Sequence, residues 1–176
     1  KFCLSVDVMY ASDDAGLDIS QVFSCNEEIC PWIDGQAGDD ALYGGNSDDI
    51  LQGGAGNDLV RGGDGDDTLT GGAGNHILIG GQGSDILDGD SDSDIAQFDG
   101  NFADYTVTVV DGVLTVTDSG NAADTLYGIE TLRFYDGDYT VGNDGTDTTL
   151  THDTVVTTLG DSGLITPTDF DVAAPD

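Results

Sequence analysis

The chain has 176 residues, which suits one ordinary domain or a compact module with flanks and excludes a large multi-domain enzyme. Its 3 Lys and Arg against 35 Asp and Glu give a formal net charge of -32, so nucleic acid and anionic membrane surfaces are excluded as partners. No apolar run approaches the roughly 18 residues of a membrane span, so no membrane insertion is predicted. Because such self-repulsion opposes folding, we expect bound cations to supply counter-charge.

Residues 1–34 are predicted to form an N-terminal cap or the end of an upstream domain. Residues 2–10 alternate apolar and other side chains with period two, which is typical of a half-buried strand. Cys3, Cys25 and Cys30 all lie in this segment; sequence leaves their pairing open, and we favour Cys25 with Cys30. The chain has no initiator Met and no signal peptide, so we expect a fragment or a processed chain.

A nine-residue repeat fills the middle of the chain. Most of the 27 glycines fall between Gly35 and Gly89, and the sequence there repeats with a fixed period of nine. The seven units span residues 35–97 and read GQAGDDALY, GGNSDDILQ, GGAGNDLVR, GGDGDDTLT, GGAGNHILI, GGQGSDILD and GDSDSDIAQ. Position one is always Gly, and position six is Asp except at His76. Biased composition alone does not produce this pattern.

The repeat predicts a coiled stack of short strands. Glycines permit sharp turns, so we expect six residues of each unit to turn and three to form a strand in which only position eight points inward. Two units make one coil of 18 residues, so the position-six residues of every second unit lie in a column. The predicted inward ladder comprises Leu42, Leu51, Val60, Leu69, Leu78, Leu87 and Ala96.

Stacked Asp side chains predict bound metal. Carboxylates at strand spacing repel one another, whereas a hard divalent cation between them takes carboxylate and carbonyl oxygens as ligands. Calcium fits best because it accepts 6 to 8 oxygens at irregular geometry, while magnesium demands a strict octahedron. Zinc would require His or Cys ligands. We therefore predict several calcium ions.

The units match G-G-x-G-x-D-x-U-x and so resemble the calcium-binding parallel β-roll of repeats-in-toxin (RTX) proteins. The stretches FDGNFADYTVTVVDGVLTVTD and DTLYGIETLRFYDG resemble the segment that follows the roll in serralysin-type secreted proteases. The resemblance implies an all-β fold: a right-handed parallel β-roll at 35–97, between the N-terminal cap and a β-rich C-terminal cap at 98–140. Residues 141–176 are then a tail that carries a secretion-signal region.

The resemblance also implies a bacterial protein that passes through a type I secretion machinery, its expected partner, and folds outside the cell where calcium binds. Its expected location is secreted, extracellular or on the cell surface. Position-six Asp side chains would bridge successive ions, and carbonyls of positions one to four would complete each shell. The predicted metal ligands are Asp40, Asp49, Asp58, Asp67, Asp85, Asp94, Asp90, Asp92, Gly35, Ala37, Gly38, Gly44, Gly45, Asn46, Gly53, Gly54, Ala55, Gly56, Gly62, Gly63, Asp64, Gly65, Gly71, Gly72, Gly74, Gly80, Gly81, Gln82 and Gly83.

The predicted ion positions differ in quality. The pairs Asp40/Asp58, Asp49/Asp67 and Asp67/Asp85 are intact, whereas the two positions next to His76 are predicted to be weak or empty because imidazole is a poor calcium ligand. Separately, the alternating carboxylates of the last unit predict a modified terminal calcium site. They are Asp88, Asp90, Asp92 and Asp94.

No catalytic role is predicted for this chain. Residues 160–163 read GDSG, like a serine-protease nucleophile motif, but lack its context and are expected to form a turn; no H-E-x-x-H occurs. The sequence favours a calcium-binding module that stabilises a secreted protein. The alternatives are an adhesin or polysaccharide-binding module, and the C-terminal part of a secreted hydrolase. Outward-facing Ile77 and Ile79 are expected to be covered by the C-terminal region or by a partner, including a second copy of the chain.

Overall fold

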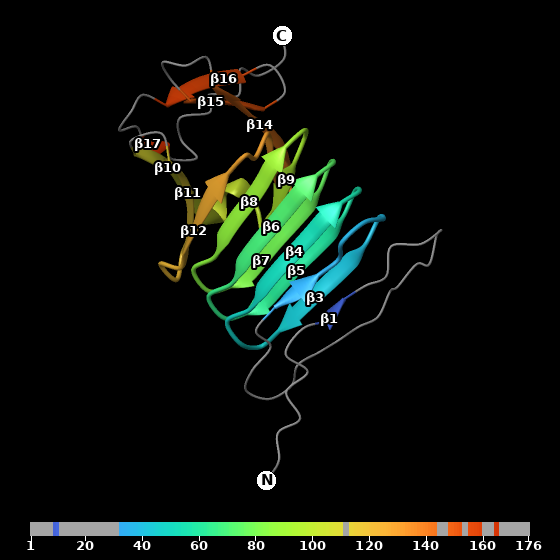
Figure 1. The fold of residues 1–176 in the computed structure, drawn as a ribbon. Helices are drawn as coiled ribbons and strands as arrows, with labels where there is room; N and C mark the ends of the chain where they lie inside the picture. Colours follow the sequence, from blue (N-terminus) through green and yellow to red (C-terminus); the bar gives the residue numbers. More distant parts are fainter. Residues whose placement is uncertain are drawn as a thin grey trace.

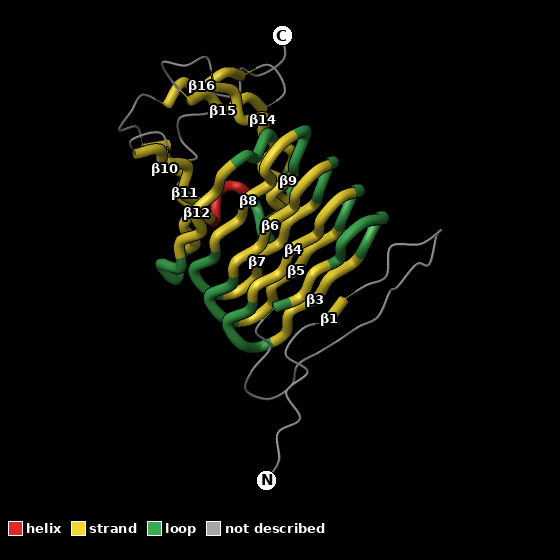
Figure 2. The backbone as a smooth tube through the Cα atoms, viewed as in Figure 1, coloured by secondary structure: helices red, strands yellow, loops and turns green. Residues whose placement is uncertain are grey.

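The computed structural model describes residues 9–10, 32–110, 113–143, 148–152, 155–159 and 164–165. This part of the chain is all-β, with a single 3-10 turn and no α-helix (Figure 2). The all-β prediction is confirmed. The cysteines and residues 160–163 lie outside the described residues, and so does most of the predicted N-terminal cap.

Within the repeats, each nine-residue unit contributes one strand. Two short strands, β1 (Met9–Tyr10) and β2 (Ile33–Asp34), precede the repeats. The repeats form β3 (Ala41–Gly45), β4 (Ile50–Ala55), β5 (Leu59–Asp64), β6 (Thr68–Ala73), β7 (Ile77–Gln82), β8 (Ile86–Ser91) and β9 (Ile95–Gln97). After them come η1 (Phe102–Asp104), β10 (Tyr105–Val110), β11 (Val113–Asp118), β12 (Ala123–Tyr127), β13 (Thr131–Phe134), β14 (Gly137–Asn143), β15 (Thr148–His152), β16 (Val155–Leu159) and β17 (Leu164–Ile165).

Successive repeat strands alternate between two sheets (Figure 1). One sheet has the order β1-β2-β4-β6-β8-β12-β11-β10-β17, and the other has the order β16-β15-β14-β13-β9-β7-β5-β3. Within the repeats the strands pair in parallel with partners 18 residues apart, as in Leu51↔Leu69 and Leu69↔Leu87. The parallel β-roll with two units per coil is therefore confirmed.

A single file of aliphatic side chains fills the space between the sheets. Position eight is fully buried in β4 to β9, and Leu42 at the first coil is 5% exposed. The file continues past the repeats through Leu126 and Leu132, which are 3% and 0% exposed. Phe98, Phe102, Phe134 and Tyr139 close the C-terminal end as a cluster of aromatic rings. The core of the roll is therefore one aliphatic side chain wide along the repeats and is enlarged by aromatic rings at the C-terminal end.

The strands are longer than the sequence predicts. Strands β4 to β8 contain six residues each and include the first three positions of the next unit. The expectation of six turn residues and three strand residues is wrong, because the glycine backbone pairs between coils, as in Gly45↔Gly63. Gly63 has φ +129°, and a Cβ there would collide with the Gly45 carbonyl oxygen. Close packing of successive coils therefore requires glycine at this position.

The C-terminal cap continues the roll before it departs from it. Strand β12 pairs in parallel with β8, and β13 pairs in parallel with β9. Residues 123–134 thus add one more coil, while η1 and the β10–β11 hairpin are inserted before it. The predicted hairpin is confirmed by the antiparallel register of β10 and β11, although its turn at residues 111–112 lies outside the described part. The boundaries given above for the four segments remain predictions.

Candidate metal centre

Position-six side chains lie inside the roll in two columns, one along each sheet. Those of Asp49, Asp58, Asp67, Asp85 and Asp94 belong to residues that are at most 2% exposed, and Asp40 at the first coil is half-buried. Besides position eight, positions six and one therefore face inward, which the sequence reading missed. Burial of so many carboxylates in one narrow core requires compensating partners.

After the first coil, one oxygen of each column carboxylate accepts a backbone hydrogen bond from the preceding coil. The amides of Asp40, Asp49 and Asp67 donate to the Oδ1 atoms of Asp58, Asp67 and Asp85, each at 2.8 Å. The donor and acceptor residues are 18 apart, so the bonds link one coil to the next. This ladder fixes the direction of each carboxylate without neutralising its charge.

The second carboxylate oxygens are buried without hydrogen-bond partners in the described part of the molecule. They are the Oδ2 atoms of Asp40, Asp58, Asp67, Asp85 and Asp94, and both oxygens of Asp49. An unsatisfied buried acceptor costs about 1–3 kcal/mol and a charged one costs more. These orphaned oxygens fit a bound cation, which supplies the missing partner and the missing positive charge.

For Asp49 and Asp58, the carbonyl oxygen of a position-one glycine lies beside an orphaned carboxylate oxygen. A Cβ added to Gly44 would lie 2.5 Å from Asp49 Oδ2 and 2.6 Å from the Gly62 carbonyl oxygen. At Gly53 the corresponding distances are 2.5 Å to Asp58 Oδ2 and 2.8 Å to the Gly71 carbonyl oxygen. Two oxygens of different coils thus face the same small space, and oxygen is the ligand that calcium prefers.

Side chains alone do not complete an ion site. Among the described residues, no group of three or more His, Cys, Asp or Glu side chains is placed to hold a metal ion. Any ion between two column carboxylates must therefore take backbone carbonyl oxygens for the rest of its shell, as a calcium ion can. The ligand set that the RTX resemblance implies likewise combines Asp carboxylates with backbone carbonyl oxygens.

The other predicted ligands lie at positions two to four. Positions two and four carry glycines with positive φ, namely Gly45, Gly54, Gly63, Gly72 and Gly81, and Gly38, Gly56, Gly65, Gly74 and Gly83. Position three points to solvent, at Ala37, Asn46, Ala55, Asp64 and Gln82. Their carbonyls already accept ladder hydrogen bonds, as from Gly38 N to Ala55 O, and each keeps a second lone pair. The ligand assignments stay predictions.

The last unit differs in geometry from the others. Asp90 and Asp92 occupy glycine positions and adopt positive φ values of 72° and 86°, which Asp tolerates better than most residues. Their side chains are exposed, whereas Asp94 is fully buried. Burial raises the pKa of Asp94, Asp92 acts on it electrostatically in the same direction, and the modified terminal site stays a prediction.

Burial makes the column carboxylates resist ionisation. Desolvation raises the pKa of Asp49 and of Asp94 to about 6, and raises that of Asp67 to about 7. Neighbouring carboxylates contribute in the same direction, while the backbone hydrogen bonds to Asp67 and Asp94 oppose the change. A cation between the carboxylates would stabilise their charged form.

His76 preserves the ladder without contributing negative charge. The Asp58 amide donates to His76 Nδ1 at 3.2 Å, and the His76 amide donates to Asp94 Oδ1 at 2.8 Å. His76 Nδ1 also lies 3.3 Å from Asp58 Oδ2, and Nε2 has no hydrogen-bond partner among the described residues. The imidazole therefore accepts the backbone hydrogen bond in place of an Asp oxygen, but it supplies no negative charge for a cation.

We expect His76→Asp to add two ions to the odd column, because it restores a carboxylate between Asp58 and Asp94. Each added ion should stabilise the loaded protein by about 2.7 kcal/mol at a calcium concentration of 100 times its Kd. His76→Asn is the matched control, since its amide oxygen can accept the same hydrogen bond without charge. Isothermal titration should show the added ions for the Asp variant alone; an equal count in both variants would exclude a role for the charge.

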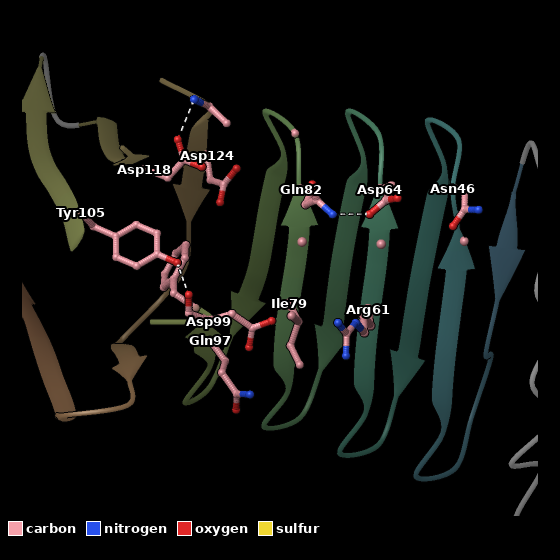
Figure 3. A pocket seen from close by; sticks show the side chains of 16 residues that line it. Asn46, Arg61, Asp64, Ile79, Gln82, Gln97, Asp99, Tyr105, Asp118 and Asp124 are labelled. Carbon is pink, nitrogen blue, oxygen red and sulfur yellow. Dashed lines mark hydrogen bonds between the residues drawn. The ribbon is translucent and has the colours of Figure 1, made fainter. Parts of the chain in front are cut away.

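A groove of about 450 Å³ runs along the outer face of the sheet that contains β3, β5 and β7 (Figure 3). Arg61 and Ile79 lie on its floor, and Tyr105 of the inserted hairpin lines its far end. Its lining also includes Asp64, Asp99, Asp118 and Asp124, so it is acidic overall. Ile79 is thus half-buried in a groove that the insert also lines. Covering by a partner or a second copy remains a prediction.

The fold and the columns define a calcium-binding β-roll, and the sequence comparison agrees. Residues 32–60, 43–78 and 61–96 match the family model described as RTX calcium-binding nonapeptide repeat. These residues are RTX repeats, and such repeats bind several Ca2+ ions per array. No curated protein matches the chain at a significant level. No helix in the described residues is long and apolar enough to cross a membrane.

Among solved structures, the chain is similar to the extracellular lipase LipA from Serratia marcescens. The two are 22% identical with a TM-score of 0.31, and the match covers 73% of this chain. It covers 21% of the lipase, so the chain spans about a fifth of the length of that protein. The serralysin-like character of the C-terminal segment remains a prediction.

Two residues of the columns, Asp124 and Glu130, were not predicted from the sequence. The amide of Asp85 donates to Asp124 Oδ1 at 2.9 Å, and that of Asp94 donates to Glu130 Oε2 at 2.8 Å. Asp124 and Glu130 therefore continue the even and the odd column beyond the repeats. The available signal was the acid-x-Leu pattern at 124–126 and again at 130–132, which copies positions six to eight of the repeat.

Proposed function

We propose that this chain is a calcium-coupled folding module that stabilises a secreted bacterial protein. The observation that carries the proposal is the pair of columns in which every position-six Asp has at least one buried oxygen without a hydrogen-bond partner in the described part. The apolar ladder is one side chain wide, so it cannot offset both these carboxylates and a net charge of -32. Bound ions would satisfy the oxygens and cancel the charge together.

The biological setting follows from this coupling. A chain that folds only with calcium stays unfolded in a calcium-poor compartment and folds after export, as suits passage through a type I secretion machinery. The RTX repeats support a secreted location. The module then contributes folding and stability, and any catalytic activity belongs to residues elsewhere in a longer protein. The adhesin and hydrolase alternatives differ in the activity of the protein to which the roll belongs. In both, calcium has the same role in folding the roll.

Far-ultraviolet circular dichroism of the chelator-treated chain tests the coupling. We expect strand signal to appear cooperatively as calcium rises through the micromolar-to-millimolar range of extracellular modules. Magnesium at equal concentration should not replace calcium, because it requires a strict octahedral shell and dehydrates reluctantly. Ionic strength is held constant, so that screening of the -32 charge does not imitate binding.

Two results would contradict the proposal. Full strand signal in chelator near pH 8 would mean that the core alone holds the roll. Equal responses to calcium and magnesium would mean that the ions act by screening charge and not by occupying defined sites.

A further inference from the structure

We propose that the C-terminal cap carries two further calcium positions, Asp85/Asp124 and Asp94/Glu130, which join it to the roll. The inference deepens the proposed function and rests on it. In both positions the second carboxylate, Asp124 or Glu130, lies beyond residue 96, where the match to the repeat family ends. In each, one carboxylate belongs to the repeats and the other to residues 123–134, so an ion would bind only when the cap is in place.

The even column shows the same bond before and after the end of the repeats. Strand β12 pairs with β8 in the register Leu126↔Leu87, which sets Asp124 beside Asp85. The Asp85 amide then donates to Asp124 Oδ1 at 2.9 Å, as the Asp67 amide donates to Asp85 Oδ1 at 2.8 Å. Asp124 therefore occupies the next position of the column.

This pair is buried and its charge is uncompensated. Asp85 is 1% exposed and Asp124 is 8% exposed, and Asp85 Oδ2 has no hydrogen-bond partner among the described residues. The two residues are neighbours in the column, since the Asp85 amide lies 2.9 Å from Asp124 Oδ1. Two ionised carboxylates in neighbouring column positions repel unless a proton or a cation lies between them. A divalent cation satisfies both at neutral pH.

The odd column ends in an equivalent arrangement. Strand β13 pairs with β9, and the Asp94 amide donates to Glu130 Oε2 at 2.8 Å. Asp94 is fully buried, and its Oδ2 is unpartnered in the described part. A Cβ added to Gly89 would lie 2.6 Å from this oxygen and would also meet the carbonyl oxygen of Gly128. Gly128 of the cap thus supplies the carbonyl that position-one glycines supply within the repeats.

The hydrogen bonds alone do not account for these carboxylates. A neutral amide at 124 or 130 could accept the same backbone hydrogen bond, and it would leave no buried charge. Asp124→Asn and Glu130→Gln therefore separate the two explanations, because each keeps the accepting oxygen and removes the charge that an ion requires.

The test counts ions bound to the full chain by equilibrium dialysis, with calcium determined by atomic emission. The double variant Asp124→Asn with Glu130→Gln should bind two fewer ions per chain than the wild type. Hydrogen–deuterium exchange at saturating calcium should become faster in β12 and β13, and stay slow in β4 to β6. The matched control is Asp99→Asn with Asp104→Asn, which removes two exposed cap carboxylates outside the columns and should bind the wild-type number.

Each outcome decides one of the two proposals. An unchanged ion count in the double variant overturns the cap sites and leaves calcium-coupled folding of the repeats intact. A wild-type chain that binds no calcium overturns the proposed function itself. If the double variant does not fold, half-buried Glu130→Gln alone should bind one ion fewer than the wild type, and an unchanged count overturns the Asp94/Glu130 position.

Discussion

Replacing Asp67 by Asn should weaken the calcium-loaded protein and strengthen the metal-free protein. Asp67 lies between Asp49 and Asp85 in the even column, so both ion positions of that stretch use its carboxylate. At a calcium concentration of 100 times each Kd, loss of two ions lowers the free energy of unfolding by about 5 kcal/mol. In chelator the sign reverses, since Asn keeps the acceptor for the Asp49 amide and removes a buried group whose pKa is raised to about 7.

Urea unfolding with and without calcium measures both effects. Asp66→Asn is the matched control, because this neighbour is exposed and its substitution changes the net charge equally. The control should leave the calcium-dependent stabilisation within about 0.5 kcal/mol of the wild type, as ordinary surface substitutions do. A variant at 67 that is destabilised by the same amount in calcium and in chelator would show a packing defect and would exclude an ion-bridging role.

Acid should stabilise the metal-free roll. The pKa values of Asp49 and Asp94 are raised to about 6 and those of Asp67 and Asp124 to about 7, chiefly by burial. A folded pKa above the unfolded value means that the folded chain binds more protons between about pH 4 and pH 7, so stability falls as pH rises through that window. Each such carboxylate contributes about 1.4 kcal/mol per pH unit in which it is protonated only in the folded state.

The measurement is chelator-treated protein followed by circular dichroism from pH 8 to pH 4.5. We expect strand signal to increase toward pH 4.5, and we expect the calcium concentration at half-saturation to be higher at pH 5 than at pH 8, because calcium must displace bound protons. A metal-free chain that is equally unfolded at both ends of the range would mean that the column carboxylates ionise normally, as in an open structure.

The part of the fold that sequence predicts is the part that repeats. The period of nine and the constant position eight determine the coil of 18 residues and the buried file of Leu51, Leu69 and Leu87. Strand length was not predictable in the same way. Gly53 and Gly54 are typical of a turn, yet they lie inside β4 because a second coil pairs with their backbone. That pairing depends on contacts between coils and not on local propensity.

The ends of the columns were hidden for a different reason. Asp124 and Glu130 are separated by six residues instead of nine, and the inserted hairpin separates both from the repeats. The pairing of β12 with β8 places Asp124 in the column of Asp85, and the pairing of β13 with β9 places Glu130 in the column of Asp94. At His76 the sequence indicated a gap in the odd column, but it could not show that the ring accepts the hydrogen bond meant for a carboxylate.

The ladder of hydrogen bonds gives the roll two chemically unlike ends. Every column amide donates toward the C-terminal side, so the first coils present bare carboxylate oxygens, as at Asp49, whose two oxygens have no partner in the described residues. The last coils present the matching donors, and Asp124 and Glu130 occupy them. Without these acceptors, the donor end of one molecule would complement the acceptor end of another, and rolls would join head to tail into open filaments. The cap therefore pairs the last column amides of the repeats, those of Asp85 and Asp94, within the same polypeptide.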